Sequence, residues 1–174
     1  MQAPLSFHEL LAQAAEAARL ADQGARGRGE EEGVLSLAVP LKPLDPLTLL
    51  PQLEPEAEDG FRFLWDGAPG LCLAASGRCN SLELSGPRRF ELAQRFSAIS
   101  LSRLALAPAT TPALARPRVL LAFAFFDSPL HPGGGGSGVQ AVLPRWQLSR
   151  QGRHCWLRLQ RTLGGEMTPR RLAE

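Results

Sequence analysis

The stretch RVLLAFAFFDSPLHPGGGGSGVQAVLPRWQLSRQGRHCWLRL, residues 118–159, decides the fold of this chain. It begins with the uninterrupted apolar run 119–126, which lies between Arg118 and Asp127. A short apolar run with charged borders is typical of a strand that is covered on both faces. We therefore expect residues 119–126 to form a core strand.

Two alternating runs follow the glycine-rich segment, at 142–150 and 155–159. Alternation of apolar and polar side chains is the period of a strand, and Gln151-Gly152 between the runs is typical of a tight turn. The sequence therefore predicts a β-hairpin. The residues expected to share one face are Val142, Trp146 and Leu148 in the first strand and Cys155, Leu157 and Leu159 in the second.

Composition limits the class of protein. The chain has 174 residues, 44% hydrophobic and 21% charged, with a net charge of +2. This length suits one domain with a substantial core, and the small charge argues against nucleic acid or an anionic membrane as partner. No apolar run approaches the ~20 residues of a membrane span, and the N-terminus lacks the basic region of a secretory signal. The three cysteines contain no CxxC pair, so we expect no disulfide framework and a cytoplasmic protein.

The N-terminal segment predicts a well-capped helix. Ser6 and Glu9 have the spacing of a capping box, and the alanine-rich body as far as Ala21 has high helix propensity. Residues 24–33, rich in Gly, Arg and Glu, predict a flexible loop. We expect the helix to be a surface appendage.

The middle of the chain predicts a strand, a short helix and a meander. Residues 34–41 form the strand, and Pro40 places it near a sheet edge. Asp45-Pro46 is a helix start, with Asp as N-cap and Pro at the first helical position. Residues 61–85 then predict three short antiparallel strands, the last two separated by a turn at Gly77.

A second long helix is predicted after this meander. Ser85-Gly86-Pro87 marks its start, and it should run to about Leu104. Its expected buried stripe is Leu92, Phe96 and Ile99. The prolines of residues 108–117 predict a loop without regular structure. Residues 168–174 resemble a helix start that stops at once, from which we expect a truncated helix.

Together these patterns predict an α+β fold, mainly an antiparallel sheet with flanking helices. The expected organisation is an N-terminal helix with a flexible loop at 1–33, a partial α+β domain at 34–167, and the start of a truncated helix at 168–174.

No catalytic constellation is visible in the sequence. The glycines 133–136 lack the lysine and the following helix of a phosphate-binding loop. The three histidines, His8, His131 and His154, lie in separate elements and form no metal-binding cluster. Asp66 and Asp127 stand at strand ends and are interpreted as turn caps. Lys42, the one lysine in the chain, lies between prolines and is interpreted as solvated.

The order and spacing of several segments resemble the N-terminal half of isochorismate synthase, a chorismate-utilising enzyme, in its cyanobacterial quinone-pathway type. These segments are VLSLAVPLKPLDPLTLL, FRFLWDG, LCLAASG with SLELSGPRRF, LLAFAFFD, and VLPRWQLSR with CWLRL. One departure is Leu121-Ala122, where family members often have paired glycines.

The resemblance implies a large α/β sandwich with the chorismate pocket between its sheets. It also implies Mg2+ on the substrate carboxylate, a lysine that activates water for attack at ring carbon 2, and a glutamate acid that helps to expel the 4-hydroxyl. Those residues lie in the family's C-terminal portion, so no catalytic, cofactor-binding or metal residue is assigned here. The expected partners are chorismate and the C-terminal half of the same chain, and the fragment alone is expected to be inactive.

Two alternatives remain open from the sequence. One is another chorismate-utilising enzyme, such as the anthranilate synthase large subunit, although its LLES-type motif has no match here. The other is a complete, non-catalytic α+β binding or scaffolding module, which the lack of a catalytic constellation would explain. The parent enzyme would act in menaquinone, phylloquinone or salicylate synthesis.

Overall fold

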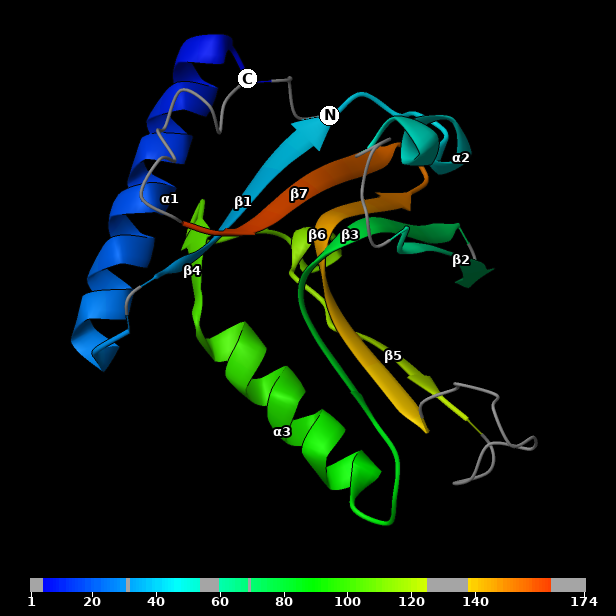
Figure 1. The fold of residues 1–174 in the computed structure, drawn as a ribbon. Helices are drawn as coiled ribbons and strands as arrows, with labels where there is room; N and C mark the ends of the chain where they lie inside the picture. The colour runs from blue at the N-terminus through cyan, green and yellow to red at the C-terminus, as the bar shows by residue number, and fades with distance from the viewer. Residues whose placement is uncertain (1–4, 31, 54–59, 69, 125–137, 164–174) are drawn as a thin grey trace.

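Figure 1 shows the computed structural model of the protein, which describes residues 5–30, 32–53, 60–68, 70–124 and 138–163. The helices are α1 (Phe7–Arg28), α2 (Pro46–Leu49) and α3 (Arg89–Ser102), with 3-10 turns η1 (Leu50–Gln52) and η2 (Ala113–Ala115). The strands are β1 (Val34–Leu41), β2 (Arg62–Ala68), β3 (Leu71–Leu84), β4 (Leu104–Ala107), β5 (Leu120–Phe123), β6 (Val139–Gln151) and β7 (His154–Thr162).

The strands form one sheet in the order β2-β3-β6-β7-β1-β4, with β5 paired to β6 beside this path. Every pairing is antiparallel except that of β1 with β4. β6 is long enough to pair with β5 through its first residues and with β7 through its last. The mainly antiparallel sheet with flanking helices confirms the predicted fold class.

The hairpin β6–β7 is confirmed, but its turn is Gly152-Arg153 rather than the predicted Gln151-Gly152, because Gln151 still pairs with His154. Gly152 has φ +55, a conformation that glycine adopts without strain. Leu148 faces Leu157 in this register. Trp146 and Leu159 pack with residues of α1, and Leu148, Cys155 and Leu157 pack with residues of α2 and η1, so these five residues share the predicted face.

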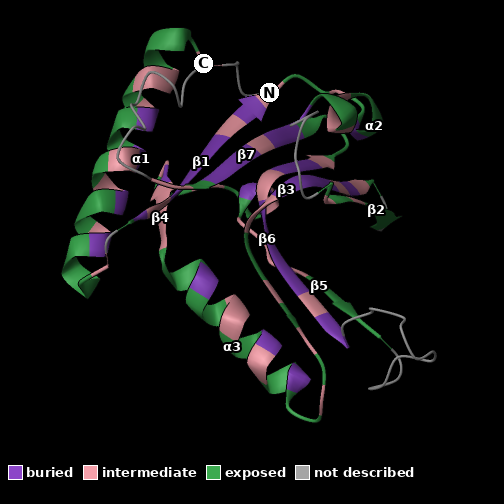
Figure 2. Ribbon diagram, viewed as in Figure 1, coloured by how far each residue is buried: buried purple, intermediate pink, exposed green. Residues whose placement is uncertain are grey.

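Helices and turns pack against the sheet, and most residues of β1, β6 and β7 are buried (Figure 2). On one side α1 packs on one part of the sheet and α2 with η1 on another, enclosing Leu35, Leu37, Leu148 and Leu159 among others. On the other side lie residues 108–118, a segment that includes η2 and that we call the strap. There Ala115 packs against Ala38 and Trp156.

The capping box of α1 is confirmed, because the Glu9 backbone N–H donates to Ser6 Oγ and the Ser6 N–H donates to Glu9 Oε2. Two other predictions for this helix are wrong. It continues through Gly24 to Arg28 and ends at Gly29, whose φ of +69 is the usual left-handed helix end. It is also no appendage, because its buried alanines let it pack closely on β1 and β4. The buried alanines are Ala14, Ala17, Ala21 and Ala25.

β1 is not an edge strand, because it lies between β7 and β4. The expectation from Pro40 still has a physical basis in the register. β4 pairs with β1 only as far as Leu37, so Pro40 has a paired neighbour on the β7 side alone. A residue that cannot donate a backbone hydrogen bond is therefore placed where none is needed.

The turn predicted at Gly77 is instead a bulge within one continuous strand, β3. Arg78 faces Pro144 and Asn80 faces Leu143, so Cys79 is an extra residue without a partner in the register. Pro144 cannot donate to the ladder, and a bulge opposite it accommodates the missing hydrogen bond. Gly77, with φ +64, provides the local change of direction.

Three details around α3 differ from expectation. It starts at Arg89, and Ser85 Oγ accepts from the Gly138 N–H rather than capping the helix. It ends at Ser102 rather than near Leu104, and residues 104–107 form the strand β4, which was not predicted. Its buried face is made by Arg89, Ala93 and Ser100, whereas the predicted Ile99 is 40% exposed.

The Phe-rich strand is shorter and less covered than predicted. β5 spans four residues, and Leu121 and Phe123 are 46% and 44% exposed. Phe123 contacts Phe90 of α3, with 5.1 Å between the ring centroids. Coverage on both faces is therefore wrong for the described part of this strand. Residues 125–137, with Asp127, His131 and the glycines, and the predicted helix start at 168–174 lie outside the described residues.

Among the described residues, no helix combines the length and the apolar composition needed to cross a membrane. The division of the chain at 33 and 167 stays a prediction.

Candidate functional site

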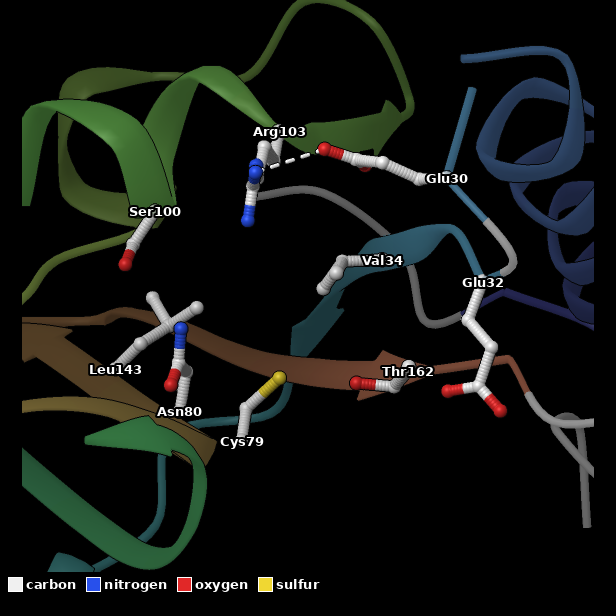
Figure 3. A pocket seen from close by; sticks show the side chains of 9 residues that line it. All are labelled: Glu30, Glu32, Val34, Cys79, Asn80, Ser100, Arg103, Leu143 and Thr162. Atoms are coloured by element: carbon white, nitrogen blue, oxygen red, sulfur yellow. Dashed lines mark ion pairs between the residues drawn. The ribbon is translucent and has the colours of Figure 1, made fainter. Parts of the chain in front are cut away.

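The polar cavity of the structure lies where the ends of several elements meet and has a volume of about 390 Å3 (Figure 3). Its walls come from the α1–β1 connection, the β3 bulge, the end of α3 and the strands β1, β6 and β7. The lining residues are Glu30, Glu32, Val34, Cys79, Asn80, Ser100, Arg103, Leu143 and Thr162. Such a volume is in the range of small-molecule sites.

The β3 bulge builds one wall of this cavity. Cys79, the unpaired bulge residue, and Asn80 line it from the same strand (Figure 3). Burial raises the pKa of the Cys79 thiol, an effect that hydrogen bonding with Thr162 opposes. The thiol is therefore protonated at neutral pH, and it lacks the lowered pKa of a nucleophilic cysteine.

An ion-pair network closes one side of the cavity. Glu30 contacts Arg103 at 2.8 Å and Arg28 at 3.0 Å, so one carboxylate joins the end of α1 to the end of α3. Figure 3 shows the Glu30–Arg103 pair above the cavity. Because a half-exposed ion pair contributes little to stability, we interpret this network as fixing the relative position of the two helix ends.

The connection before β1 brings these residues close to the sheet. A Cβ at Gly33 would collide with the backbone of Ala21, so a glycine is needed where the chain returns from α1. The Gly33 carbonyl accepts from the Leu163 N–H at 2.8 Å, which ties this connection to the end of β7.

The lining does not have the composition of a catalytic or metal centre. The described residues contain no group of three or more His, Cys, Asp or Glu side chains that could hold a metal ion. Glu30 and Glu32 are two carboxylates, and Glu30 is already engaged by two arginines. The cavity therefore does not fit Mg2+, and it holds no lysine for general-base chemistry. What the lining offers is hydrogen bonding to a small polar molecule, from Ser100, Asn80 and Thr162.

The residues weighed as candidates in the sequence do not meet in space. Lys42 and His8 are exposed, at the end of β1 and near the start of α1. His154 and Asp66 are also exposed, on β7 and β2. None of these four residues lines the polar cavity.

Sequence reasoning missed the residues that do line it. Ser100 was not among the residues expected to be buried in α3, and it is 4% exposed and lines the cavity. Pro144 in an otherwise alternating strand was the available signal, since a proline inside a sheet predicts a bulge in a neighbouring strand.

Comparison with known families identifies the class of protein. The family described as chorismate binding enzyme matches residues 16–174. Because this match covers most of the chain, the protein belongs to the chorismate-binding enzyme family.

A search of solved structures finds a match to MenF, the menaquinone-specific isochorismate synthase from Escherichia coli. The two share 20% sequence identity with a TM-score of 0.47, over 89% of this chain and 31% of that chain. The chain thus spans about a third of the length of that enzyme. A search of curated proteins finds no significant match.

Proposed function

We propose that this chain is the N-terminal part of an isochorismate synthase, an enzyme that isomerises chorismate to isochorismate for menaquinone or phylloquinone synthesis. The observation that carries the proposal is the family match over residues 16–174. The finer assignment rests on the ordered segments of the sequence, above all VLPRWQLSR with CWLRL, which form β6 and β7.

In this proposal the described sheet is scaffolding, and the reacting groups belong to the segment that follows Glu174. That segment would supply the lysine that activates water for attack at ring carbon 2 and the glutamate that protonates the departing 4-hydroxyl. It would also supply the ligands for Mg2+, for which the described residues offer no suitable site. The partners would be chorismate and this C-terminal segment, in the cytoplasm.

The described geometry supports a scaffolding role in two ways. The lining of the polar cavity includes no lysine that could act as the water-activating base, and its thiol, Cys79, has a raised rather than a lowered pKa. The exposed apolar side chains of β5 and α3, including Phe90 and Phe123, give the sheet a surface on which further chain can pack.

The experiment compares two purified proteins, namely the 174-residue chain and the same chain extended through the coding sequence after Glu174. Each is incubated with chorismate and Mg2+, and isochorismate is measured by chromatography. We expect turnover from the extended protein alone. Turnover by the 174-residue chain, or a stop codon directly after Glu174, would contradict the proposal.

The extended protein also separates the alternatives within the family. An anthranilate synthase large subunit would convert chorismate to anthranilate when supplied with ammonia, whereas an isochorismate synthase would not. A non-catalytic module would give no product from either protein.

A further inference from the structure

The Ser100 hydroxyl of α3 is a buried polar group without a hydrogen-bond partner within the described residues. Two other serines of the same helix satisfy their hydroxyls locally. Ser97 Oγ donates to the Ala93 carbonyl at 2.8 Å. Ser102 Oγ donates to the Ile99 carbonyl at 2.9 Å. Because buried hydroxyls in folded proteins are nearly always hydrogen-bonded, we expect a partner for Ser100 in the space that it lines.

That space is the polar cavity, where Asn80 of the β3 bulge is a second side chain with unused hydrogen-bonding capacity (Figure 3). Its amide can donate two hydrogen bonds and accept others, and it also has no partner among the described residues. Thr162 differs, because its side chain is engaged with the Cys79 thiol. Ser100 and Asn80 therefore supply donors and acceptors that the described protein leaves open.

The charged side chains of the lining favour a ligand without negative charge. Arg103 is the one cation among the lining residues, and it is paired with Glu30 at 2.8 Å. Glu32 is exposed and forms no ion pair within the described residues, so its carboxylate accepts hydrogen bonds and repels an anion. Hydroxyl groups suit this lining, because each can donate to a carboxylate and accept from an amide or a serine.

Val34 of β1 and Leu143 of β6 add a short aliphatic surface to these polar groups. Leu143 is fully buried and Val34 is half-buried, so packing in the sheet fixes both positions. The C–H groups of a hydroxylated carbon chain can pack on this surface while its hydroxyls reach the polar side chains. The lining as a whole matches a molecule with several hydroxyls on a short carbon chain.

We propose that the polar cavity binds a small neutral polyol. Its hydroxyls would bond to Ser100, Asn80 and the Glu32 carboxylate, and its carbon chain would pack on Val34 and Leu143. The volume of about 390 Å3 is sufficient for such a molecule. A polyol has no carboxylate, so it belongs to a different chemical class from chorismate. The site does not depend on the proposed function, because described residues alone build it and its test needs no enzyme activity.

Three six-carbon molecules test the site in the 174-residue protein. Sorbitol is the neutral polyol, gluconate is its counterpart with a carboxylate at one end, and hexanediol keeps only the two terminal hydroxyls. Each is titrated into isotope-labelled protein while the amide resonances are followed by NMR. A melting temperature would not serve, because polyols stabilise proteins without binding through exclusion from the protein surface.

We expect sorbitol to shift the resonances of Asn80 and Ser100 in a saturable way, with little change at His8 in the first turn of α1. Gluconate should bind about tenfold more weakly, because its carboxylate is repelled by Glu32. Hexanediol should also bind about tenfold more weakly, because it lacks the inner hydroxyls.

Cys79 provides an independent measurement. Its thiol lines the same cavity, whereas Cys72 and Cys155 do not. Bound sorbitol should therefore slow the reaction of Cys79 with iodoacetamide and leave the rates at the other two cysteines unchanged. Mass spectrometry of the digested protein gives the three rates separately.

Two variants identify the side chains that bind. Ser100→Ala and Asn80→Ala should each weaken sorbitol binding about fivefold, which corresponds to the loss of one hydrogen bond. Neither change removes a hydrogen bond within the described residues, so both proteins should keep the original circular dichroism spectrum. Ser102→Ala changes an exposed serine of the same helix outside the cavity, and it should bind sorbitol as the original protein does.

Four results would overturn the proposal. Without saturable shifts, water alone would fill the cavity. If gluconate or hexanediol bound as tightly as sorbitol, the site would not select a neutral polyol. Unchanged sorbitol affinity in both Ser100→Ala and Asn80→Ala, or an unchanged Cys79 rate at saturating sorbitol, would place the bound molecule elsewhere.

Discussion

Single residues explain both the confirmed and the wrong predictions. The capping box of Ser6 and Glu9 and the N-cap of Asp45 were predictable, because each depends on neighbours within three residues. The burial of Arg158 was not predictable. Its hydrogen-bond partners, Ser36 and Ala115, come from distant parts of the chain, and an arginine in an alternating strand ordinarily faces water.

Replacing Arg158 should destabilise the fold. In Arg158→Leu the Ala115 carbonyl and the Ser36 oxygens lose their donors while they stay buried, and relief of the buried charge offsets only part of this loss. We expect the free energy of unfolding to fall by about 2 kcal/mol in urea titrations. Arg161→Leu changes an exposed arginine of the same strand and should stay within about 0.5 kcal/mol of the original protein. Equal stability of the two variants would contradict the structural role of Arg158.

The cysteines should react slowly with iodoacetamide. Burial raises the pKa of Cys72, Cys79 and Cys155, so at neutral pH each has a smaller thiolate fraction than a free thiol. As pH rises toward the raised pKa values, the thiolate fraction and the labelling rate should increase. Mass spectrometry of the intact protein gives the rate, with glutathione as the free-thiol reference. Labelling of any of the three at the glutathione rate would contradict this prediction, whereas denaturant should make all three reactive.

At the scale of elements, local patterns predicted the hairpin β6–β7 but misjudged how elements continue or end. Gly77 marked a change of direction, yet a bulge and a turn both favour glycine, and only the pairing with β6 distinguishes them. Residues 104–107 contain only leucine and alanine, which suit the end of a helix as well as a strand. Their strand conformation depends on parallel pairing with β1, a contact distant in sequence.

The same substitution at two glycines should have opposite effects. Gly77→Ala places a side chain at φ +64 and should lower the free energy of unfolding by about 1 kcal/mol. Gly27→Ala lies within α1, where an added Cβ meets nothing within 4 Å, and should raise it by about 0.5 kcal/mol. Both values are measurable by urea unfolding. A neutral or stabilising effect at Gly77 would contradict the bulge geometry.

At the scale of the whole molecule, composition and strand patterns predicted a mainly antiparallel α+β sheet, and the structure confirms it. The position of the polar cavity could not be predicted, because its lining comes from five separate segments whose approach depends on the complete topology. Coverage of β5 was misjudged for a related reason. A hydrophobic run indicates that a strand is buried by other parts of a protein, but the sequence pattern alone does not identify the element that packs on it.

The exposed apolar surface should be detectable in solution. Phe123 of β5 contacts Phe90 of α3, Leu121 lies two residues before Phe123 on the same strand, and all three are more than a third exposed. We expect the 174-residue chain to bind anilinonaphthalene sulfonate, with a fluorescence increase that Leu121→Lys together with Phe123→Lys largely removes. Leu47→Lys, which changes an exposed leucine of α2, is the matched control and should leave the signal unchanged. If the double lysine variant and Leu47→Lys lost the same amount of fluorescence, the dye would not be binding at the surface of β5 and α3.

The forked pairing of β6 has a consequence for how the molecule opens. β3 lies along one side of β6, while β5 and β7 divide the other side between them. Because successive amides of a strand point to opposite sides, detaching one neighbour frees only those β6 amides that are bonded to it, whereas detaching β4 from β1 frees every amide of β4 that is bonded within the sheet. Amide protons of residues 146–151 of β6, which pair with β3 on one side and β7 on the other, should therefore exchange late with deuterium, and those of β4 should exchange early.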